Sequence, residues 1–255
     1  MWRAAFTELV ATACLLFTVT ISIISCLESN VSEPKLLVPF AVFIVAFLLL
    51  LTTVPLSGGH MSPVFTLSFF YVLAQCTGSI LAYAMIKSVI NKSYEEKYWL
   101  GGCVVDGNGK GVSPWTALMV EFSCTFLVLF VAVTVGFDKR RSEELGLKTV
   151  CAVLAGAMGV AFYVSMTVTG TPGYGGVGLN PARCLGPALL VGGRLWYGYW
   201  VFWVGPGLAC IVYHGVTLLL PRELVVVDNG GNENGGASGS DNSTSSQNFP
   251  FNYII

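Results

Sequence analysis

The sequence predicts an all-α membrane protein in which six transmembrane helices and two re-entrant half-helices form an inverted repeat. Three observations predict this fold. Charged residues are scarce, six apolar segments are long enough to cross a bilayer, and each half of the chain carries one carboxylate followed by a glycine-flanked turn that ends in proline. We expect one membrane domain over residues 1–220, with repeats over about 4–90 and 115–220, and a separate tail over 221–255.

The composition excludes several classes of protein. Of the 255 residues, 54% are hydrophobic and 11% are charged, whereas a soluble domain carries about 25% charged residues. A surface this poor in charge is suited to lipid. The net charge of −1 does not favour a nucleic-acid partner. We recognise no nucleophile–base pair, metal cluster or phosphate-binding loop, so we expect neither an enzyme nor a bound metal or cofactor.

A bilayer core requires about 20 apolar residues per helix. Six segments meet this length: Ala5–Leu27, Leu36–Leu56, Phe69–Ile90, Trp115–Phe137, Thr149–Thr169 and Trp196–Leu220. Residues 221–255 are rich in Gly, Asn and Ser. They cannot bury enough apolar surface to fold, so this tail is predicted to be disordered.

Basic residues in a short connection predict which side of the membrane it faces. The connection between the fourth and fifth spans carries Lys139, Arg140, Arg141 and Lys148. It is therefore predicted to be cytoplasmic, and with six spans both termini are cytoplasmic as well. The long loop over 91–113 then lies outside, where Asn30 and Asn91 begin possible glycosylation sequons.

The two halves share one pattern. Glu8 precedes Pro63 by 55 positions, and Glu121 precedes Pro181 by 60 positions. Because each half contains three spans, the halves are inverted relative to each other in the membrane. Inverted repeats with segments interrupted by Gly and Pro place a solute site near the bilayer midplane.

The second turn has the features of a helix start. Asn180 is a suitable N-cap, and Pro181 suits the first helical position. The apolar stretch that follows is too short to span, so it is predicted to be a half-helix with partial positive charge at its N-terminus. Taken alone, Asn-Pro-Ala also fits an ordinary loop turn, but the matching Ser62-Pro63 turn in the first half favours two opposed half-helices. Such opposed tips would repel cations and protons.

These motifs resemble the two signature boxes of the major intrinsic protein (aquaporin) superfamily over about residues 4–220. The boxes are Ser62, Pro63 and Val64 after Ser57–His60, and Asn180, Pro181 and Ala182 after Gly178-Leu179. The Asn180–Cys184 sequence, the Ser-Pro-Val box and Leu100–Cys103 are similar to the plant X intrinsic proteins. The resemblance implies an hourglass fold and a homotetramer in the plasma membrane with one pore per subunit. It also implies passive transport of glycerol, urea, boric acid or hydrogen peroxide, with weak water flux.

The resemblance also implies a selectivity filter of four residues on the outer side of the boxes. Counted from Ser62 and Asn180, these are Val42, Val168, Val177 and Arg183. A buried arginine in a membrane usually lines a water-filled cavity, and the alternative is an arginine that reaches the surface. Three valines would make the filter apolar and favour alkyl-bearing polyols or neutral metalloid acids.

Four further residues carry predictions. Glu8 and Glu121 are expected to accept hydrogen bonds from the backbone of the two re-entrant loops, and a proton relay is the alternative. Cys103 is a possible thiol site that bonds across subunits, binds a metal or stays free. Cys184 is expected to line the pore, where its thiol would react with mercurials.

One feature departs from the family pattern. Pro63 precedes Gly78 by 15 positions, whereas Pro181 precedes Gly207, taken as the equivalent packing glycine, by 26. About a dozen residues are therefore missing after the first box, and the 24 residues from Pro63 to Lys87 reach only about 36 Å as a helix. The first half-helix is predicted to be truncated or fused to the third span.

This truncation leaves two functions open: a passive channel for small neutral solutes, or a non-conducting or regulatory subunit of heterotetramers with paralogues. A coupled transporter, the third class considered, would need paired acidic residues at a midplane site, and the sequence offers only the two loop-bracing glutamates.

Overall fold

The computed structural model describes residues 2–29, 34–66, 68–107, 109–169 and 173–219. Within these ranges the side chains of residues 34, 35, 139, 167–169 and 219 are not described. The predicted tail over 221–255 and Asn30 lie outside the described residues.

The described part of the chain is helical and contains no strand. Its elements are α1 (Trp2–Glu28), α2 (Pro34–Ser57), the 3₁₀ turn η1 (Pro63–Phe65), α3 (Phe69–Val89), α4 (Lys92–Tyr98), η2 (Trp99–Gly101), α5 (Pro114–Val131), the π-helical turn η3 (Ala132–Phe137), α6 (Lys139–Thr169), α7 (Pro181–Val191), η4 (Gly193–Trp196) and α8 (Val201–Leu219).

The six predicted spans are confirmed as apolar helices of membrane-crossing length. They cover Trp2–Glu28, Leu36–Ser57, Phe69–Val89, Pro114–Phe137, Arg140–Met166 and Gly193–Leu218. In addition, α7 is an apolar helix of 11 residues, which is too short to cross and matches the predicted half-helix.

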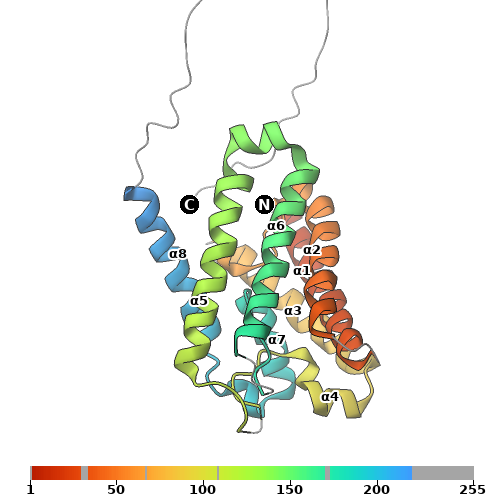
Figure 1. Ribbon diagram of the computed structural model, residues 1–255. Helices are drawn as coiled ribbons and strands as arrows, with labels where there is room; N and C mark the ends of the chain where they lie inside the picture. The colour runs from red at the N-terminus through yellow and green to blue at the C-terminus, as the bar shows by residue number, and fades with distance from the viewer. Residues whose placement is uncertain (1, 30–33, 67, 108, 170–172, 220–255) are drawn as a thin grey trace, which may run out of the picture.

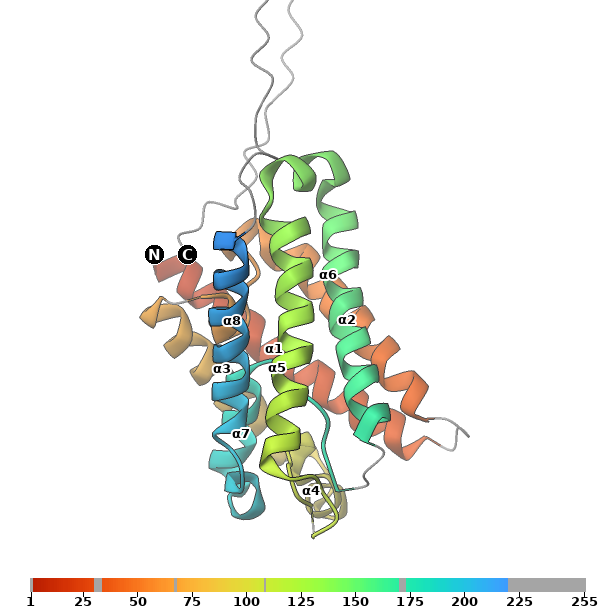
Figure 2. The same cartoon turned by 60° about the vertical axis from the view of Figure 1, so that its left-hand side comes forward.

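The helices form a bundle in which each half packs in the same way. In the first half α1 packs against α2 and α3, and in the second half α5 packs against α6 and α8; α2 and α6 join the halves, and α7 lies against α3. Figures 1 and 2 show the α5–α6 connection at one end of the molecule and α4 at the other. We call these the α5–α6 end and the α4 end. The start of α1 and the end of α8 both lie toward the α5–α6 end (Figure 2).

Two glycines allow close contact between helices, one in each half: α3 approaches α1, and α8 approaches α5. A Cβ on Gly78 of α3 would lie 2.4 Å from the carbonyl oxygen of Leu9 on α1. A Cβ on Gly205 of α8 would lie 2.7 Å from the Cβ of Glu121 on α5, whereas a Cβ on Gly207 would meet nothing within 4 Å. The packing glycine of the last helix is therefore Gly205, and the choice of Gly207 was wrong.

The first half-helix is reduced to a single turn. Ser62 caps η1, because its Oγ accepts a hydrogen bond from the Val64 N–H at 3.4 Å. The chain is extended again at Thr66, and α3 begins only at Phe69. The half-helix is thus truncated rather than fused to α3, as the 15-position spacing between Pro63 and Gly78 requires.

A long loop closes the α4 end. Its residues 99–112 pair with the loop that precedes α7: the Gly107 N–H donates to the Gly173 carbonyl at 2.7 Å, and the Gly175 N–H donates to the Val104 carbonyl at 2.9 Å. The side chain of Leu100 in this loop is fully buried. The loop is therefore anchored over α7, where its backbone can contact side chains of that helix.

The glycine contacts predict that only one of two nearby substitutions on α8 destabilises the protein. We expect Gly205→Ala to lower the stability of the folded protein, because a close-packed interior accommodates an extra methyl group at a cost of about 1–3 kcal/mol. Thermal unfolding in detergent micelles measures this effect. Gly207→Ala is the matched control, and an unfolding temperature that falls equally for both variants would contradict the packing role of Gly205.

Candidate functional site

Glu8 of α1 braces the first loop from inside the bundle. Its side chain is fully buried. It accepts four hydrogen bonds, from Ser57 Oγ at 2.6 Å, the His60 N–H at 3.1 Å, the Met61 N–H at 2.7 Å and Gln75 Nε2 at 2.9 Å. Two of these donors belong to the segment between α2 and η1, and Ser57 is the last residue of α2, so the carboxylate fixes the backbone path that leads to Ser62.

Glu121 of α5 holds the second loop in the same manner. It too is fully buried, and it accepts hydrogen bonds from the N–H groups of Gly178 and Leu179, the latter at 3.3 Å. The residues just before the two boxes, Met61 and Leu179, share a left-handed backbone with φ of 46° and 56°. Non-glycine residues rarely adopt this conformation, so the two loops use the same uncommon turn to present Ser62 and Asn180.

The two loops meet through Asn180. Its Oδ1 caps α7 by accepting hydrogen bonds from the N–H groups of Ala182 at 3.0 Å and Arg183 at 3.4 Å, and Pro181 occupies the first helical position. Its Nδ2 donates to the Met61 carbonyl at 2.8 Å. This hydrogen bond joins the two loops, and Asn180 also lines the cavity beside Arg183.

Arg183 lies in the interior of the molecule, with 5% of the residue exposed. Its Nη1 donates to the Val177 carbonyl at 3.2 Å, its Nη2 donates to the Gly101 carbonyl at 3.4 Å, and its guanidinium lies 5.3 Å from the centre of the Phe162 ring. Among the described residues, its Nε has no hydrogen-bond partner. The guanidinium is thus held by two loops and an aromatic ring, and this position differs from that of an arginine at the surface.

Arg183 borders a cavity that is open to the outside, with about 660 Å³ of space between the side chains and at its mouth. Val42 of α2 and Phe162 of α6 line it with Arg183. The side chain of Val177 instead packs in a buried cluster with Cys124, Val128 and Ala161, and the side chain of Val168 lies outside the described residues. The structure therefore brings Val42 and Arg183 together at the cavity, and Val177 joins them through its carbonyl rather than its side chain.

The sequence reasoning missed Phe162. It lies six positions before Val168, nearly two helical turns earlier on α6. No pattern in the sequence marks Phe162 as different from the other aromatic residues of the spans. Its place beside Arg183 is visible only in three dimensions.

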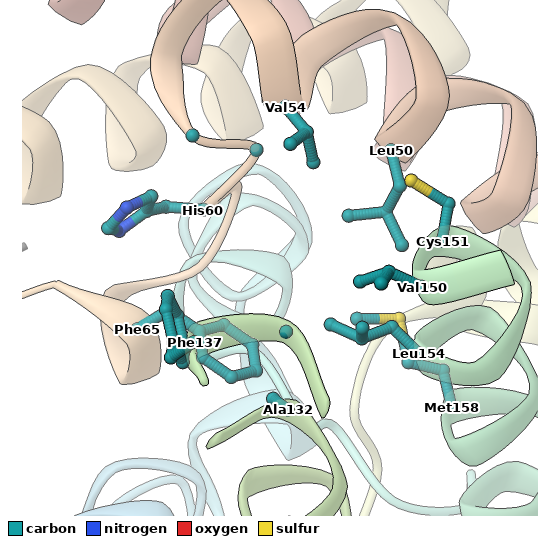
Figure 3. Close-up of a pocket in the computed structure, with 13 residues that line it drawn as sticks. Leu50, Val54, His60, Phe65, Ala132, Phe137, Val150, Cys151, Leu154 and Met158 are labelled. Atoms are coloured by element: carbon teal, nitrogen blue, oxygen red, sulfur yellow. The ribbon is translucent and has the colours of Figure 1, made fainter. Parts of the chain in front are cut away.

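A second cavity of about 450 Å³ continues toward the α5–α6 end. In Figure 3, His60 and Phe65 lie on one side of it, and Leu50, Cys151 and Leu154 lie on the other. Four residues line both cavities: Leu50, His60, Phe65 and Met158. The two cavities thus meet at this set of side chains, and together they run from Arg183 to the α5–α6 end.

The structure corrects the prediction for the cysteines. Cys103 and Cys184 form a disulfide within the chain, across a sequence separation of 81 residues. Neither is a free thiol, a metal ligand or a bond between subunits, and Cys184 is buried rather than exposed in the pore. The other six cysteines lie in or beside apolar segments, and no local pattern in the sequence pairs Cys103 with Cys184.

The disulfide ties the long loop to the half-helix next to Arg183. Arg183 Nη1 lies 3.5 Å from Cys103 Sγ, and Gly101, two residues earlier, supplies a carbonyl to Nη2. Cys184 follows Arg183 directly on α7. The disulfide therefore holds the acceptor loop and the guanidinium in one fixed arrangement.

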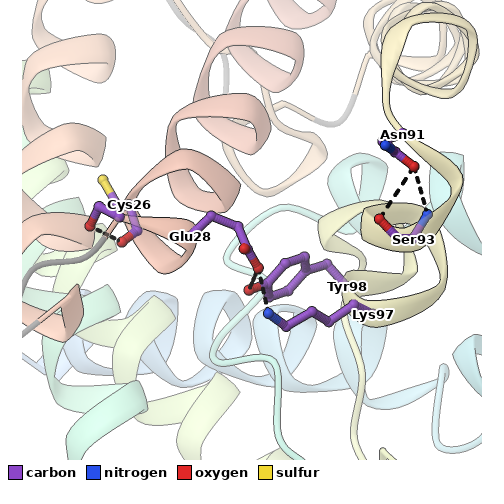
Figure 4. Close-up of polar contacts among 7 residues, drawn as sticks. Cys26, Glu28, Asn91, Ser93, Lys97 and Tyr98 are labelled. Atoms are coloured by element: carbon purple, nitrogen blue, oxygen red, sulfur yellow. Dashed lines mark hydrogen bonds and ion pairs between the residues drawn. The ribbon is translucent and has the colours of Figure 1, made fainter.

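Ionic contacts attach α4 to the bundle. Glu28 at the end of α1 accepts hydrogen bonds from Lys97 Nζ and the Tyr98 hydroxyl, both at 2.5 Å, and Asn91 caps α4 by accepting from the Ser93 N–H (Figure 4). The Glu28 carboxylate raises the pKa of Lys97 to about 12. Lys97 is exposed, so this pair orients the loop rather than stabilising the fold strongly.

Comparisons with known proteins agree with this geometry. Residues 1–213 match the family described as Major intrinsic protein. The chain is 30% identical to Aquaporin PIP2-7 of Musa acuminata over 84% of this chain and 80% of that protein. It is 28% identical to Aquaporin-4 of Bos taurus over 84% of this chain and 66% of that protein.

A solved structure has the same fold. The X-ray structure of the aquaglyceroporin from Plasmodium falciparum superimposes with a TM-score of 0.71, covering 88% of this chain and 98% of that chain, at 16% identity. At this identity the likeness concerns the fold alone.

The four hydrogen bonds at Glu8 predict a large effect of its neutralisation. Glu8→Gln should destabilise the protein, because hydrogen bonds to a charged acceptor contribute about 1.5–3 kcal/mol each. In addition, the NH₂ group of the glutamine would face the N–H and O–H donors that now bind the carboxylate. Thermal unfolding in detergent measures the loss. Glu28→Gln makes the same chemical change at the α4 end, and a Glu8 variant as stable as this control would refute the bracing role.

Removal of the disulfide is predicted to weaken the discrimination between small cations and urea. Cys103→Ser should leave loop 99–112 free to move from Arg183, so that proteoliposomes admit small cations more readily relative to urea. Cys14→Ser, which alters an exposed free cysteine, should change nothing. If the ratio of the two fluxes is the same in Cys103→Ser and the unaltered protein, the disulfide does not position the arginine.

Proposed function

This chain belongs to the major intrinsic protein family and is a multi-pass membrane channel for small solutes rather than an enzyme, and on that premise we propose that it selects uncharged solutes. Glycerol, urea, boric acid and hydrogen peroxide are the proposed class, with weak water flux. Membership of the plant X intrinsic proteins remains a prediction, which Asn180–Cys184 and Leu100–Cys103 support.

The observation that carries the proposal is the buried guanidinium of Arg183 opposite an apolar wall. Its Nε lies without a partner among the described residues, and Val42 and Phe162 line the same cavity. A neutral solute that accepts a hydrogen bond from the guanidinium fits this site without the cost of burying a second charge, and glycerol can also place its CH groups against the apolar wall. A cation would lose its hydration shell and meet a positive charge, so its passage is unfavourable.

The half-helix α7 supports the exclusion of cations further. Its N-terminus, capped by Asn180, carries partial positive charge where the two loops meet. The turn η1 has only three residues, so it adds little dipole from the other side. We therefore assign cation exclusion mainly to α7 and Arg183.

Weak water flux follows from the lining of the two cavities. Most of their side chains are apolar, among them Leu15, Val19, Val42, Leu50 and Leu154. Narrow apolar passages lose water readily. A solute that brings its own apolar surface is less affected than a column of water.

We further propose a homotetramer in the plasma membrane with both termini in the cytoplasm. The basic residues of the α5–α6 connection support this orientation, and the starts and ends of the bundle lie toward that same end (Figure 2). Large apolar side chains such as Phe6, Leu48, Phe130, Val160 and Ile211 are exposed on the outer faces, where membrane lipid or a neighbouring subunit would cover them.

A second candidate function is a non-conducting or regulatory subunit that joins heterotetramers with paralogues. The observation that favours it is the truncated half-helix, which leaves Phe65 between the two cavities. Such a subunit would show no flux of any solute by itself and would change the flux of a conducting paralogue reconstituted with it.

The channel proposal predicts that Arg183 controls discrimination. In stopped-flow experiments on proteoliposomes, Arg183→Ala should raise methylammonium flux relative to urea flux by roughly tenfold or more, since each lost charge-assisted interaction contributes about 1.5–3 kcal/mol. Arg194→Ala at the same end, where the side chain pairs with Asp106 on the exposed surface, should leave the ratio unchanged.

Three results would count against the proposal in different ways. An unaltered flux ratio in Arg183→Ala would remove the arginine from the filter. Absence of flux for every solute would favour the subunit function. Flux of cations through the unaltered protein would contradict selection of neutral solutes.

A further inference from the structure

The inverted repeat gives Arg183 a counterpart. Arg183 lies three positions after the cap residue Asn180, and Phe65 lies three positions after the cap residue Ser62. Each follows a proline at the first helical position and a small or β-branched residue. The same register that aims Arg183 into the cavity near the α4 end therefore aims Phe65 into the passage on the opposite side of the boxes.

The cavities bear out this placement of Phe65. It is one of the four residues that line both, with Leu50 from α2, Met158 from α6 and His60 from the first loop. Phe65 also packs against the buried cluster that contains Cys124 and Val128 of α5. Side chains from four parts of the chain thus surround the point where the two cavities meet.

The truncation of the first half-helix explains why an aromatic ring lies there. The turn η1 ends at Phe65, so no further helical turn carries the chain away from the axis. Its backbone is fixed on both sides, because the Phe65 N–H donates to the Ser62 carbonyl at 3.1 Å and the Val64 carbonyl lies 3.7 Å from Cys210 Sγ of α8. These contacts hold the backbone of η1 in place, so the loop cannot shift to move the Phe65 ring out of the passage.

We propose that Phe65 is a second specificity-determining residue, which sets the size limit for solutes at an apolar constriction between the two cavities. This inference rests on the proposed channel function. The constriction near Arg183 admits uncharged solutes, and the constriction at Phe65 admits only solutes of small cross-section. Leu50 and Met158 complete its apolar side and His60 supplies the remaining side, so a wider solute must displace side chains to pass.

A series of substitutions at Phe65 tests the size limit. Fluxes of urea, glycerol and the larger polyol erythritol are measured in proteoliposomes for Phe65→Trp, the unaltered protein, Phe65→Leu and Phe65→Ala. The ratio of erythritol flux to urea flux should rise in that order. We expect the Ala variant to exceed the unaltered protein by about tenfold, since a difference of one methylene group in an apolar site already changes discrimination by about that factor.

The matched control removes the same ring from a place outside the passage. Phe47 of α2 packs against the cluster of Leu50, Cys151 and Ala155 and lines neither cavity. Phe47→Ala should therefore leave the flux ratio unchanged. If Phe65→Ala does not fold, the Leu and Trp variants still bracket the unaltered protein and decide the order.

The outcomes separate this inference from the channel function. If the unaltered protein conducts and the ratio is constant through the series, Phe65 is not the size limit, although the channel function stands. If the unaltered protein is silent and Phe65→Ala conducts, Phe65 is the barrier and the chain alone is not a channel. If every protein in the series is silent, both proposals are overturned.

Discussion

The fold depends on how backbone polar groups are paired inside the bilayer. Two stretches of non-helical backbone reach the middle of this molecule, and at that depth no water is available to their N–H groups unless they line a cavity. Glu8 and Glu121, both fully buried, supply the missing acceptors. A single carboxylate can accept several hydrogen bonds at once, so each half needs only one. Without them the loops would not be held where Asn180 reaches the Met61 carbonyl.

Once the loops are fixed, the remaining features of the passage follow from register. The residue three positions after each cap enters the passage, which places Arg183 on one side of the boxes and Phe65 on the other. The long loop and the disulfide between Cys103 and Cys184 then restrain the guanidinium from the α4 end. The two halves thus share one backbone arrangement but place different side chains in the passage, a charged arginine in one half and a bulky phenylalanine in the other.

Much of this arrangement could be predicted from the sequence, because its signals are local. The length of apolar segments gave the six spans, the repeated carboxylate and proline turn gave the inverted halves, and the short spacing from Pro63 to Gly78 gave the truncated first half-helix. Counts that had to identify a single packing or lining residue were less successful. Phe162 of α6 lies beside Arg183 although no count along the chain singles it out, and Gly205 rather than Gly207 packs on α5, because helix rotation is not visible in spacing. The disulfide required the path of loop 99–112, which no local pattern specifies.

The most direct test of this account is a map of the protein in lipid nanodiscs by electron cryo-microscopy, at a resolution that shows side chains near the two boxes. The account predicts Asn180 Nδ2 within hydrogen-bond distance of the Met61 carbonyl, with the Glu8 and Glu121 carboxylates against the N–H groups of their loops. A map in which the two loops are separated by another helix or by lipid, or in which either carboxylate faces away from its loop, would contradict it.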